Sequence, residues 1–181
     1  MNFMAFFWIL LVIILLFESR ILFRNKHSSH DKGSLKLFTF IGYLLIIVAL
    51  LLYYFDIGLF EVVVFRYIGL IILVGGFVLR QWSIHVLGKF FIPVVNLQKK
   101  QKVIEAGPYS YLRHPSYTGL FLELSGFSLA LTNWIGIILV FALFLPVILH
   151  RIKIEERFLS RNLRGYNQYM TRTWRLIPFI Y

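Results

Sequence analysis

The sequence predicts an all-α integral membrane protein with about five transmembrane helices. Of its 181 residues, 59% are hydrophobic, well above the roughly 45–50% that is usual for a soluble domain. The mean hydropathy is +0.77. The apolar residues form separate runs, several of them near the length of about 20 residues that a transmembrane helix needs. No linker-like tract divides the chain, so we expect a single membrane domain over residues 1–181.

The apolar runs define the expected spans. The first run ends at Glu18 and Arg20 and lacks both a cationic leader and a cleavage signal, so we expect a span and not a removable signal peptide. The last two runs are separated only by Thr132 and Asn133, which predicts a tight helical hairpin. The predicted spans are residues 3–17, 37–55, 62–79, 117–131 and 134–149.

The basic residues predict the orientation in the membrane. All but Arg66 of the 19 Lys and Arg residues lie in the segments that follow the first, third and fifth runs. Lys and Arg are enriched in cytoplasmic loops, so we expect these segments in the cytoplasm and the N-terminus outside. Membrane topology and anionic lipid headgroups explain the placement of the basic residues behind the net charge of +11 better than nucleic acid does.

Several kinds of chemistry are excluded by missing residues or motifs. The sequence has no cysteine, and His85 and His150 are not at metal-ligand spacing from any partner, so no metal site is expected. No Walker motif, GxGxxG or GxSxG occurs, and Gly75-Gly76 within the third run is expected to be a close helix contact. Soluble nucleotide-binding folds are therefore not expected.

Two cytoplasmic segments are long and patterned enough to hold a site. Residues 1–79 supply the N-terminal spans, and residues 80–181 form a second part made of an interfacial loop, the hairpin 117–149 and the C-terminal segment 150–181. The stretch "RQWSIHVLGKFF", which begins at Arg80, is expected to form an interfacial helix. The helix that follows the fifth span is expected to end near Gly165.

The stretch "GPYSYLRHPSYTG", residues 107–119, combines turn formers, rings and charges just before an apolar run. One interpretation is an aromatic belt with a snorkelling arginine, which is common in membrane proteins. The other is a ligand site, because Pro115 starts a helix whose free N–H groups, with Arg113 beside them, suit an anionic group. An aromatic belt does not explain why turn, cation, imidazole and helix start coincide, and both interpretations stay open on these residues alone.

Carboxylates form the other notable feature, since the chain has only eight acidic residues. Arg151 and Glu155 are four residues apart on one helix face, so they can pair or bind one ligand jointly; ordinary interfacial ion pairs are the alternative, with Glu156 beside them. Glu123 lies inside the fourth run, where a charge costs at least ~2.5–3.5 kcal/mol on insertion scales. We expect Glu123 to face the bundle interior or to be protonated, with a ligand-facing role left open.

Taken in order, "GPYSYLRHPSYTG", "RIKIEERFL", "GYNQY" and "RLIPFI" resemble the isoprenylcysteine carboxyl methyltransferase family and its relatives among membrane phospholipid N-methyltransferases. The resemblance covers roughly residues 90–181. It implies an integral-membrane enzyme that binds S-adenosylmethionine in a cytoplasm-facing pocket closed by the C-terminal segment. A lipophilic acceptor would enter that pocket from the bilayer.

The resemblance also implies roles for individual residues. Glu155 would hold the cofactor's ammonium group, and Arg151 would face the acceptor. The remaining residues implied in cofactor binding are Asn96, Gln101, Lys102, Val103, Ile104, Tyr109, Arg113, His114, Pro115, Ser116 and Tyr117. Tyrosine rings suit a sulfonium through cation–π contact.

The acceptor stays open at this level. Carboxyl O-methylation of an isoprenylcysteine-like substrate is the leading hypothesis, and a carboxylate acceptor needs no general base. A phospholipid amine or a small lipophilic metabolite methylated on oxygen or sulfur is the alternative, for which Glu156 or His114 could act as a base. A non-catalytic membrane protein that binds lipid headgroups or a partner is the third possibility.

Overall fold

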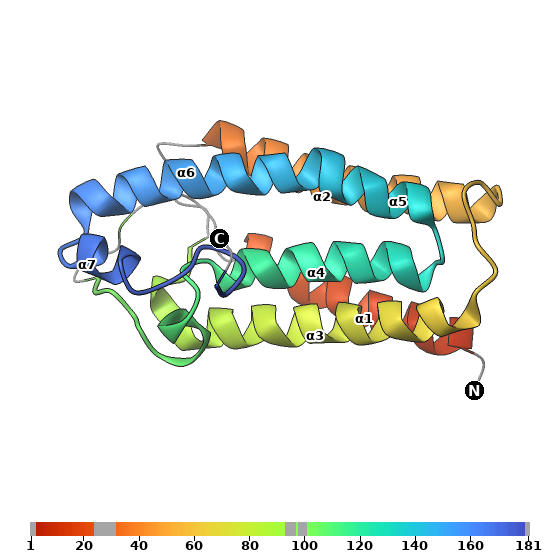
Figure 1. Cartoon of the computed structure of the whole chain (residues 1–181), viewed down its shortest axis with the longest axis horizontal. Coiled ribbons are helices and arrows are strands. Elements are labelled where there is room, and N and C mark those ends of the chain that lie inside the picture. Colours follow the sequence, from red (N-terminus) through yellow and green to blue (C-terminus); the bar gives the residue numbers. More distant parts are fainter. Residues whose placement is uncertain (1–2, 24–31, 93–96, 98–100, 180–181) are drawn as a thin grey trace.

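The computed structural model describes residues 3–23, 32–92, 97 and 101–179 and shows a bundle of long helices (Figure 1). None of these residues belongs to a strand; two isolated bridges pair Leu59 with Asn133 and Leu112 with Trp174. Short 3₁₀ turns cover Gly88–Phe90 and Gly107–Ser110. The helices are α1 (Phe3–Phe23), α2 (Lys32–Tyr54), α3 (Val63–Leu87), α4 (Pro115–Ala130), α5 (Trp134–Leu139), α6 (Leu145–Asn162) and α7 (Tyr166–Met170).

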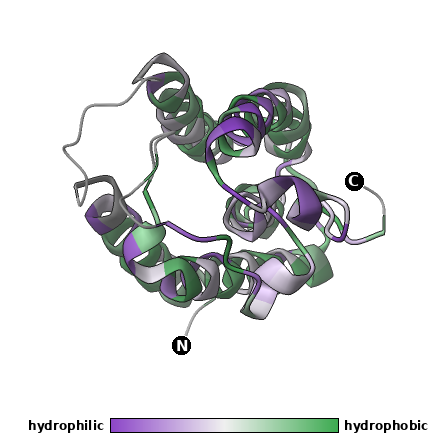
Figure 2. Cartoon of the chain, turned by 90° about the vertical axis from the view of Figure 1, so that its left-hand side faces the viewer, coloured by the Kyte–Doolittle hydropathy of each residue, from purple (hydrophilic) through white to green (hydrophobic). Residues whose placement is uncertain are grey.

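The predicted all-α membrane fold is confirmed. In the described part of the chain, four helical segments are long and apolar enough to cross a membrane: Phe3–Arg20, Gly33–Tyr54, Val63–Phe90 and Trp134–Asn162. Helix α4, which contains most of the fourth predicted span, is not one of these four; it has 16 residues, which at 1.5 Å per residue gives about 24 Å. It lies among the other helices (Figure 2) and buries small and apolar residues against them.

Helices α3 and α4 pack closely because glycines line their contact. A Cβ atom on Gly76 would lie 2.6 Å from the carbonyl oxygen of Gly119, and one on Gly119 would lie 2.7 Å from the carbonyl oxygen of Gly76. Backbone atoms cannot move aside as side chains can, so both positions require glycine. The predicted helix contact at Gly75-Gly76 is thus found at Gly76, whereas Gly75 has open space beside it.

Helix α3 continues past the point where the sequence suggested that the third span ends. Arg80 was expected to close that span and to begin a separate interfacial helix, but α3 runs unbroken to Leu87 and Arg80 is buried. The expectation was wrong because the charge of Arg80 is neutralised inside the bundle. Its guanidinium makes two bonds to the carboxylate of Glu18 on α1, at 2.6 and 2.7 Å.

The predicted hairpin between α4 and α5 is present. The side chain of Asn133 accepts a hydrogen bond from the N–H of Gly136 at 2.8 Å and donates one to the carbonyl of Ile57 at 2.9 Å, so it caps α5 and ties the hairpin to the α2–α3 connection. A π-helical turn, Val140–Phe144, joins α5 to α6. Helix α6 ends at Asn162, close to the expected end near Gly165. Gly165 has a φ of 86° and lies directly before α7.

The two ends of the bundle differ. The α2–α3 connection and the α4–α5 hairpin lie at one end, where α1 also begins (Figure 1). At the other end α3 finishes, α4 starts, and α7 and the C-terminal segment gather. Seen from that end, hydrophilic segments meet between the apolar helices (Figure 2). This is the end at which a polar site can form.

Candidate functional site

A cavity of about 220 Å³ runs from the polar end of the bundle into its apolar interior. Its polar part is lined by the loop after α3, the start of α4, one face of α6 and α7. Its apolar part is lined by α1, α2, α3, α4 and the π-helical turn Val140–Phe144. The apolar part includes Leu11, Ile14, Phe38, Ile46, Leu73, Leu124, Phe127 and Phe144.

Most of the site residues proposed from the sequence line this one cavity. Gln101, Lys102, Val103 and Ile104 do so from the loop; Tyr109, Arg113, His114, Ser116 and Tyr117 from the turn and the start of α4; Arg151 and Glu155 from α6. Pro115 opens α4 and is buried, but it is not part of the lining. Asn96 lies outside the described residues.

Tyr117 joins the two charged groups on α6. Its hydroxyl donates a hydrogen bond to Oε2 of Glu155 at 2.9 Å and accepts one from Nε of Arg151 at 2.8 Å. Arg151 is 2% exposed, donates a second bond from Nη1 to Ser34 Oγ at 2.8 Å, and lies 5.5 Å from the ring centre of Phe38. Arg151 and Glu155, which the sequence placed four residues apart on one helix face, are therefore bridged by the hydroxyl of Tyr117.

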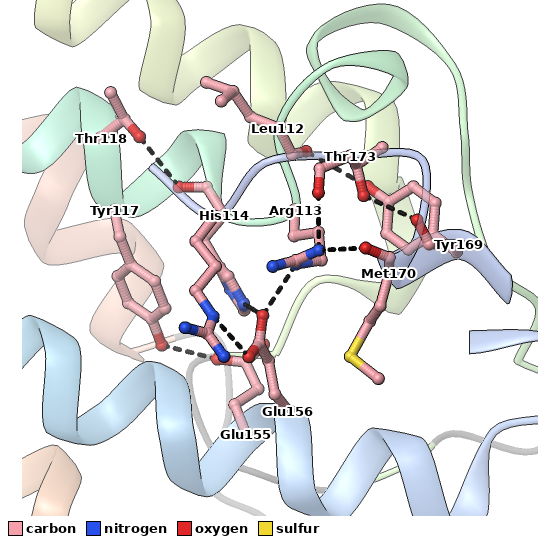
Figure 3. A network of polar contacts seen from close by, with 11 residues as sticks. Leu112, Arg113, His114, Tyr117, Thr118, Glu155, Glu156, Tyr169, Met170 and Thr173 are labelled. Carbon is pink, nitrogen blue, oxygen red and sulfur yellow. Dashed lines mark hydrogen bonds and ion pairs between the residues drawn. The ribbon is translucent and has the colours of Figure 1, made fainter. Parts of the chain in front are cut away.

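Glu156 has a different environment from its neighbour Glu155. Its Oε1 accepts a bond from Nε of Arg113 at 2.8 Å and lies 3.5 Å from Nε2 of His114. Its Oε2 accepts a bond from Nε of Arg175, also at 2.8 Å. Figure 3 shows the Glu156 carboxylate between Arg113 and His114. Glu156 does not line the cavity, so its carboxylate links the turn and the C-terminal segment to α6.

The C-terminal segment is held against the turn by backbone and side-chain bonds. The N–H groups of Arg113 and His114 donate to the carbonyls of Trp174 and Arg175 at 2.7 and 3.1 Å. Nη1 of Arg113 donates to the carbonyls of Met170 and Thr173, both at 2.6 Å (Figure 3). These hydrogen bonds hold the C-terminal segment beside the polar part of the cavity.

Two tyrosines of α7 complete the wall, and the sequence did not single them out as site residues. Tyr166 and Tyr169 both line the cavity, and the hydroxyl of Tyr169 donates to the carbonyl of Tyr109 at 2.7 Å. Burial raises the pKa of Tyr109, Tyr166 and Tyr169 above the usual value. These phenols therefore stay protonated, and the hydroxyl of Tyr169 acts as a hydrogen-bond donor. The spacing of Tyr166 and Tyr169 in "GYNQY" was the sequence signal that could have identified them as site residues.

A second group of charged residues also faces the cavity: Glu18, Arg80 and Glu123. Nη1 of Arg80 reaches Oγ of Ser116 at 2.9 Å and the carbonyl of Ser116 at 3.2 Å, which ties α1 and α3 to the start of α4. The sequence had indicated Glu18 and Arg80 only as charges that end transmembrane spans. Within the described part of the chain, no group of three or more His, Asp or Glu side chains could hold a metal ion.

The architecture is that of a helical membrane protein with an amphipathic cavity. Residues 64–165 match the family model described as phospholipid methyltransferase, which is more than half of the chain. The chain belongs to this family. This match confirms the assignment to a family of membrane methyltransferases that the sequence motifs indicated.

Curated relatives agree with this assignment. Protein-S-isoprenylcysteine O-methyltransferase from Saccharomyces cerevisiae is 28% identical over 116 residues, which is 62% of this chain and 48% of the relative. Protein-S-isoprenylcysteine O-methyltransferase B from Arabidopsis thaliana is 29% identical over 115 residues, which is 62% of this chain and 58% of the relative. The chain thus spans about half to three fifths of these relatives.

A solved structure has a similar fold. It is that of the eukaryotic intramembrane Ras methyltransferase ICMT (isoprenylcysteine carboxyl methyltransferase), with a TM-score of 0.64 and 28% identity. The similarity covers 83% of this chain and 54% of that structure. It therefore extends beyond residues 90–181, the part of the chain over which the sequence resembles the family.

Proposed function

We propose that this protein is an S-adenosylmethionine-dependent methyltransferase of the membrane that methylates a lipophilic acceptor. The proposed reaction is O-methylation of the carboxylate of an isoprenylcysteine-like substrate. The observation that carries the proposal is the continuity of one cavity, which joins the polar group around Tyr117, Arg151 and Glu155 to an apolar interior. The names of the relatives support the same chemistry.

The polar part of the cavity has the kinds of polar and aromatic groups that binding of S-adenosylmethionine requires. Glu155 offers a carboxylate for an ammonium group, and the loop 101–104 offers main-chain groups and side chains. Tyr109, Tyr166 and Tyr169 supply aromatic walls and protonated phenols, which suit a sulfonium. When bound, the cofactor supplies an electrophilic methyl group, so the protein's task is alignment and exclusion of water.

Arg151 is proposed to orient the acceptor. It sits at the junction of the polar and apolar parts, held by Tyr117 and Ser34, and an arginine positions a carboxylate well because its guanidinium can make two parallel hydrogen bonds. An ionised carboxylate is itself the nucleophile and needs no base. We therefore assign Glu156 a structural role in place of the base suggested from the sequence, since Arg113 and Arg175 already engage its carboxylate.

The polar end of the cavity is proposed to face the cytoplasm, with the N-terminus outside. The end of α1, the end of α3 and the end of α6 lie at that end of the bundle (Figure 1), and the basic segments of the sequence begin within these helices and continue beyond them. The C-terminal segment is proposed to close the site from the aqueous side, while the acceptor's apolar body occupies the interior.

Calorimetric titration of the detergent-solubilised protein with S-adenosylhomocysteine tests the proposal. We expect saturable binding by the wild type, at least a tenfold loss in Glu155→Ala because a charged hydrogen-bonding partner is removed, and no change in Glu61→Ala, which alters an exposed acid elsewhere. A folded wild type that does not bind would refute the proposal. Mass analysis of products from carboxylate, phenol, thiol and amine acceptors then separates the leading acceptor from the alternatives, which the comparisons do not favour.

A further inference from the structure

The cavity continues beyond the proposed reaction centre, and one acidic side chain lies along this extension. Helix α4 presents a single face to the cavity, made of Ser116, Tyr117, Leu120, Glu123, Leu124 and Phe127. Their recurrence every three or four residues is that of one helix face. Beyond Ser116 and Tyr117, Glu123 is the polar member of this face.

Glu123 is buried yet incompletely satisfied. Its residue is 4% exposed, and its Oε1 has no hydrogen-bond partner among the residues that the structure describes. Buried carboxylate oxygens are normally hydrogen-bonded, because leaving one without a partner is costly. An unpaired oxygen on a cavity wall therefore points to a donor that arrives with a ligand.

The adjacent cation does not supply that donor. Arg80 directs Nε and Nη2 to the two carboxylate oxygens of Glu18 and Nη1 to Ser116. All three nitrogens of its guanidinium are thus engaged with other groups. The Glu18–Arg80 pair is balanced in charge, which leaves Glu123 as an additional acidic group in this part of the cavity.

The position of Glu123 relative to the reaction centre follows from helix geometry. It is six residues after Tyr117 on α4, which corresponds to about 9 Å along the helix axis at 1.5 Å per residue. Apart from Glu123 and the Glu18–Arg80 pair, this part of the wall includes the apolar side chains of Leu11, Ile14, Leu73 and Phe127. A pure hydrocarbon chain would fill this space but would leave the Glu123 oxygen without a partner.

We infer that Glu123 is a specificity-determining residue that binds a hydroxyl or amine group on the acceptor, at a level about 9 Å along α4 from Tyr117. The inference rests on the proposed methyltransferase function and narrows its substrate class to lipophilic acceptors that carry a hydrogen-bond donor within their apolar body. A site built to bind such a group rejects analogues that lack it far more strongly than it rejects a change in chain length.

The test uses the whole chain in lipid nanodiscs, saturated with S-adenosylhomocysteine, and measures acceptor binding by calorimetry. The probes are N-acetyl-S-farnesylcysteine and two analogues that carry a hydroxymethyl or an aminomethyl branch, placed to match the offset of about 9 Å along α4. The variants are Glu123→Leu, Glu123→Gln and, as a control on a remote and exposed acid, Glu61→Gln.

We expect the wild type and Glu61→Gln to bind one branched analogue at least about tenfold more tightly than the parent probe. Glu123→Leu should abolish this preference, and Glu123→Gln, which keeps an acceptor oxygen, should retain part of it. The inference would be overturned if Glu123→Leu kept the same preference for the branched analogue as the wild type. It would also be overturned if the wild type preferred the parent probe, bound only that probe, or bound none of the three. A wild type that does not bind S-adenosylhomocysteine would instead refute the proposed function itself.

Discussion

Tyr117 donates a hydrogen bond to Glu155 across 2.9 Å, and the same phenol oxygen accepts a bond from Arg151. One hydroxyl therefore sets the position of the carboxylate proposed to hold the cofactor and of the guanidinium proposed to hold the acceptor. The two binding functions are coupled through a residue of "RHPSY", which lies on α4, while both charged groups lie on α6.

Replacing Tyr117 by phenylalanine should weaken both functions at once. We expect Tyr117→Phe to lower affinity for S-adenosylhomocysteine by about tenfold, because a hydrogen bond to a charged group contributes about 1.5–3 kcal/mol. The loss in turnover should be larger, since Arg151 loses the same anchor. Calorimetry and initial-rate measurements check this, with Tyr111→Phe, an exposed tyrosine of the same turn, as the control. Undiminished binding and rate would contradict the coupling.

Glu156 should matter for stability more than for chemistry. Glu156→Ala leaves Arg113 and Arg175 without their carboxylate, and breaking a buried ion pair costs about 3 kcal/mol or more. We expect a clear fall in the midpoint of thermal unfolding in detergent. Glu105→Gln, which removes an exposed pair with Arg172, should cost less than about 1 kcal/mol. A stable Glu156→Ala variant that binds cofactor normally but does not turn over would instead identify a base.

The contact between α3 and α4 predicts opposite outcomes at two adjacent glycines. Gly76→Val places side-chain atoms against the backbone of Gly119, so we expect loss of about 3 kcal/mol of stability or failure to fold. Gly75→Ala adds a methyl group in open space and should leave stability unchanged or slightly higher, because alanine favours helix more than glycine. Size-exclusion profiles and thermal unfolding distinguish the two, and equal tolerance at both positions would contradict the packing.

Local patterns predicted the features that depend on residues close together in the chain. The break at Thr132 and Asn133 indicated the hairpin because a short polar interruption between two apolar runs leaves no other connection. The motif "GPYSYLRHPSY" indicated a site because turn formers and charges coincide with a helix start, and most of its proposed residues do line one cavity.

Features that depend on distant partners could not be predicted. Arg80 looked like the end of a span because a charge in an apolar run is costly, and only the position of Glu18, 62 residues earlier, makes burial tolerable. In the same way, nothing in "IEERF" distinguishes Glu155 from Glu156. The direction of the helix face decides that one lines the cavity and the other meets Arg113 and Arg175.

The Glu18–Arg80 pair permits a test by a double-mutant cycle. Each single change, Glu18→Leu or Arg80→Met, leaves one charge inside the bundle without its partner, and we expect each to cost about 3–5 kcal/mol. The double variant replaces both groups by apolar side chains and should be more stable than either single variant. Chemical unfolding in detergent measures the three differences. Additive losses would mean that the two side chains do not interact in the membrane-embedded protein, and α3 would then lack the compensation that explains its unbroken course past Arg80.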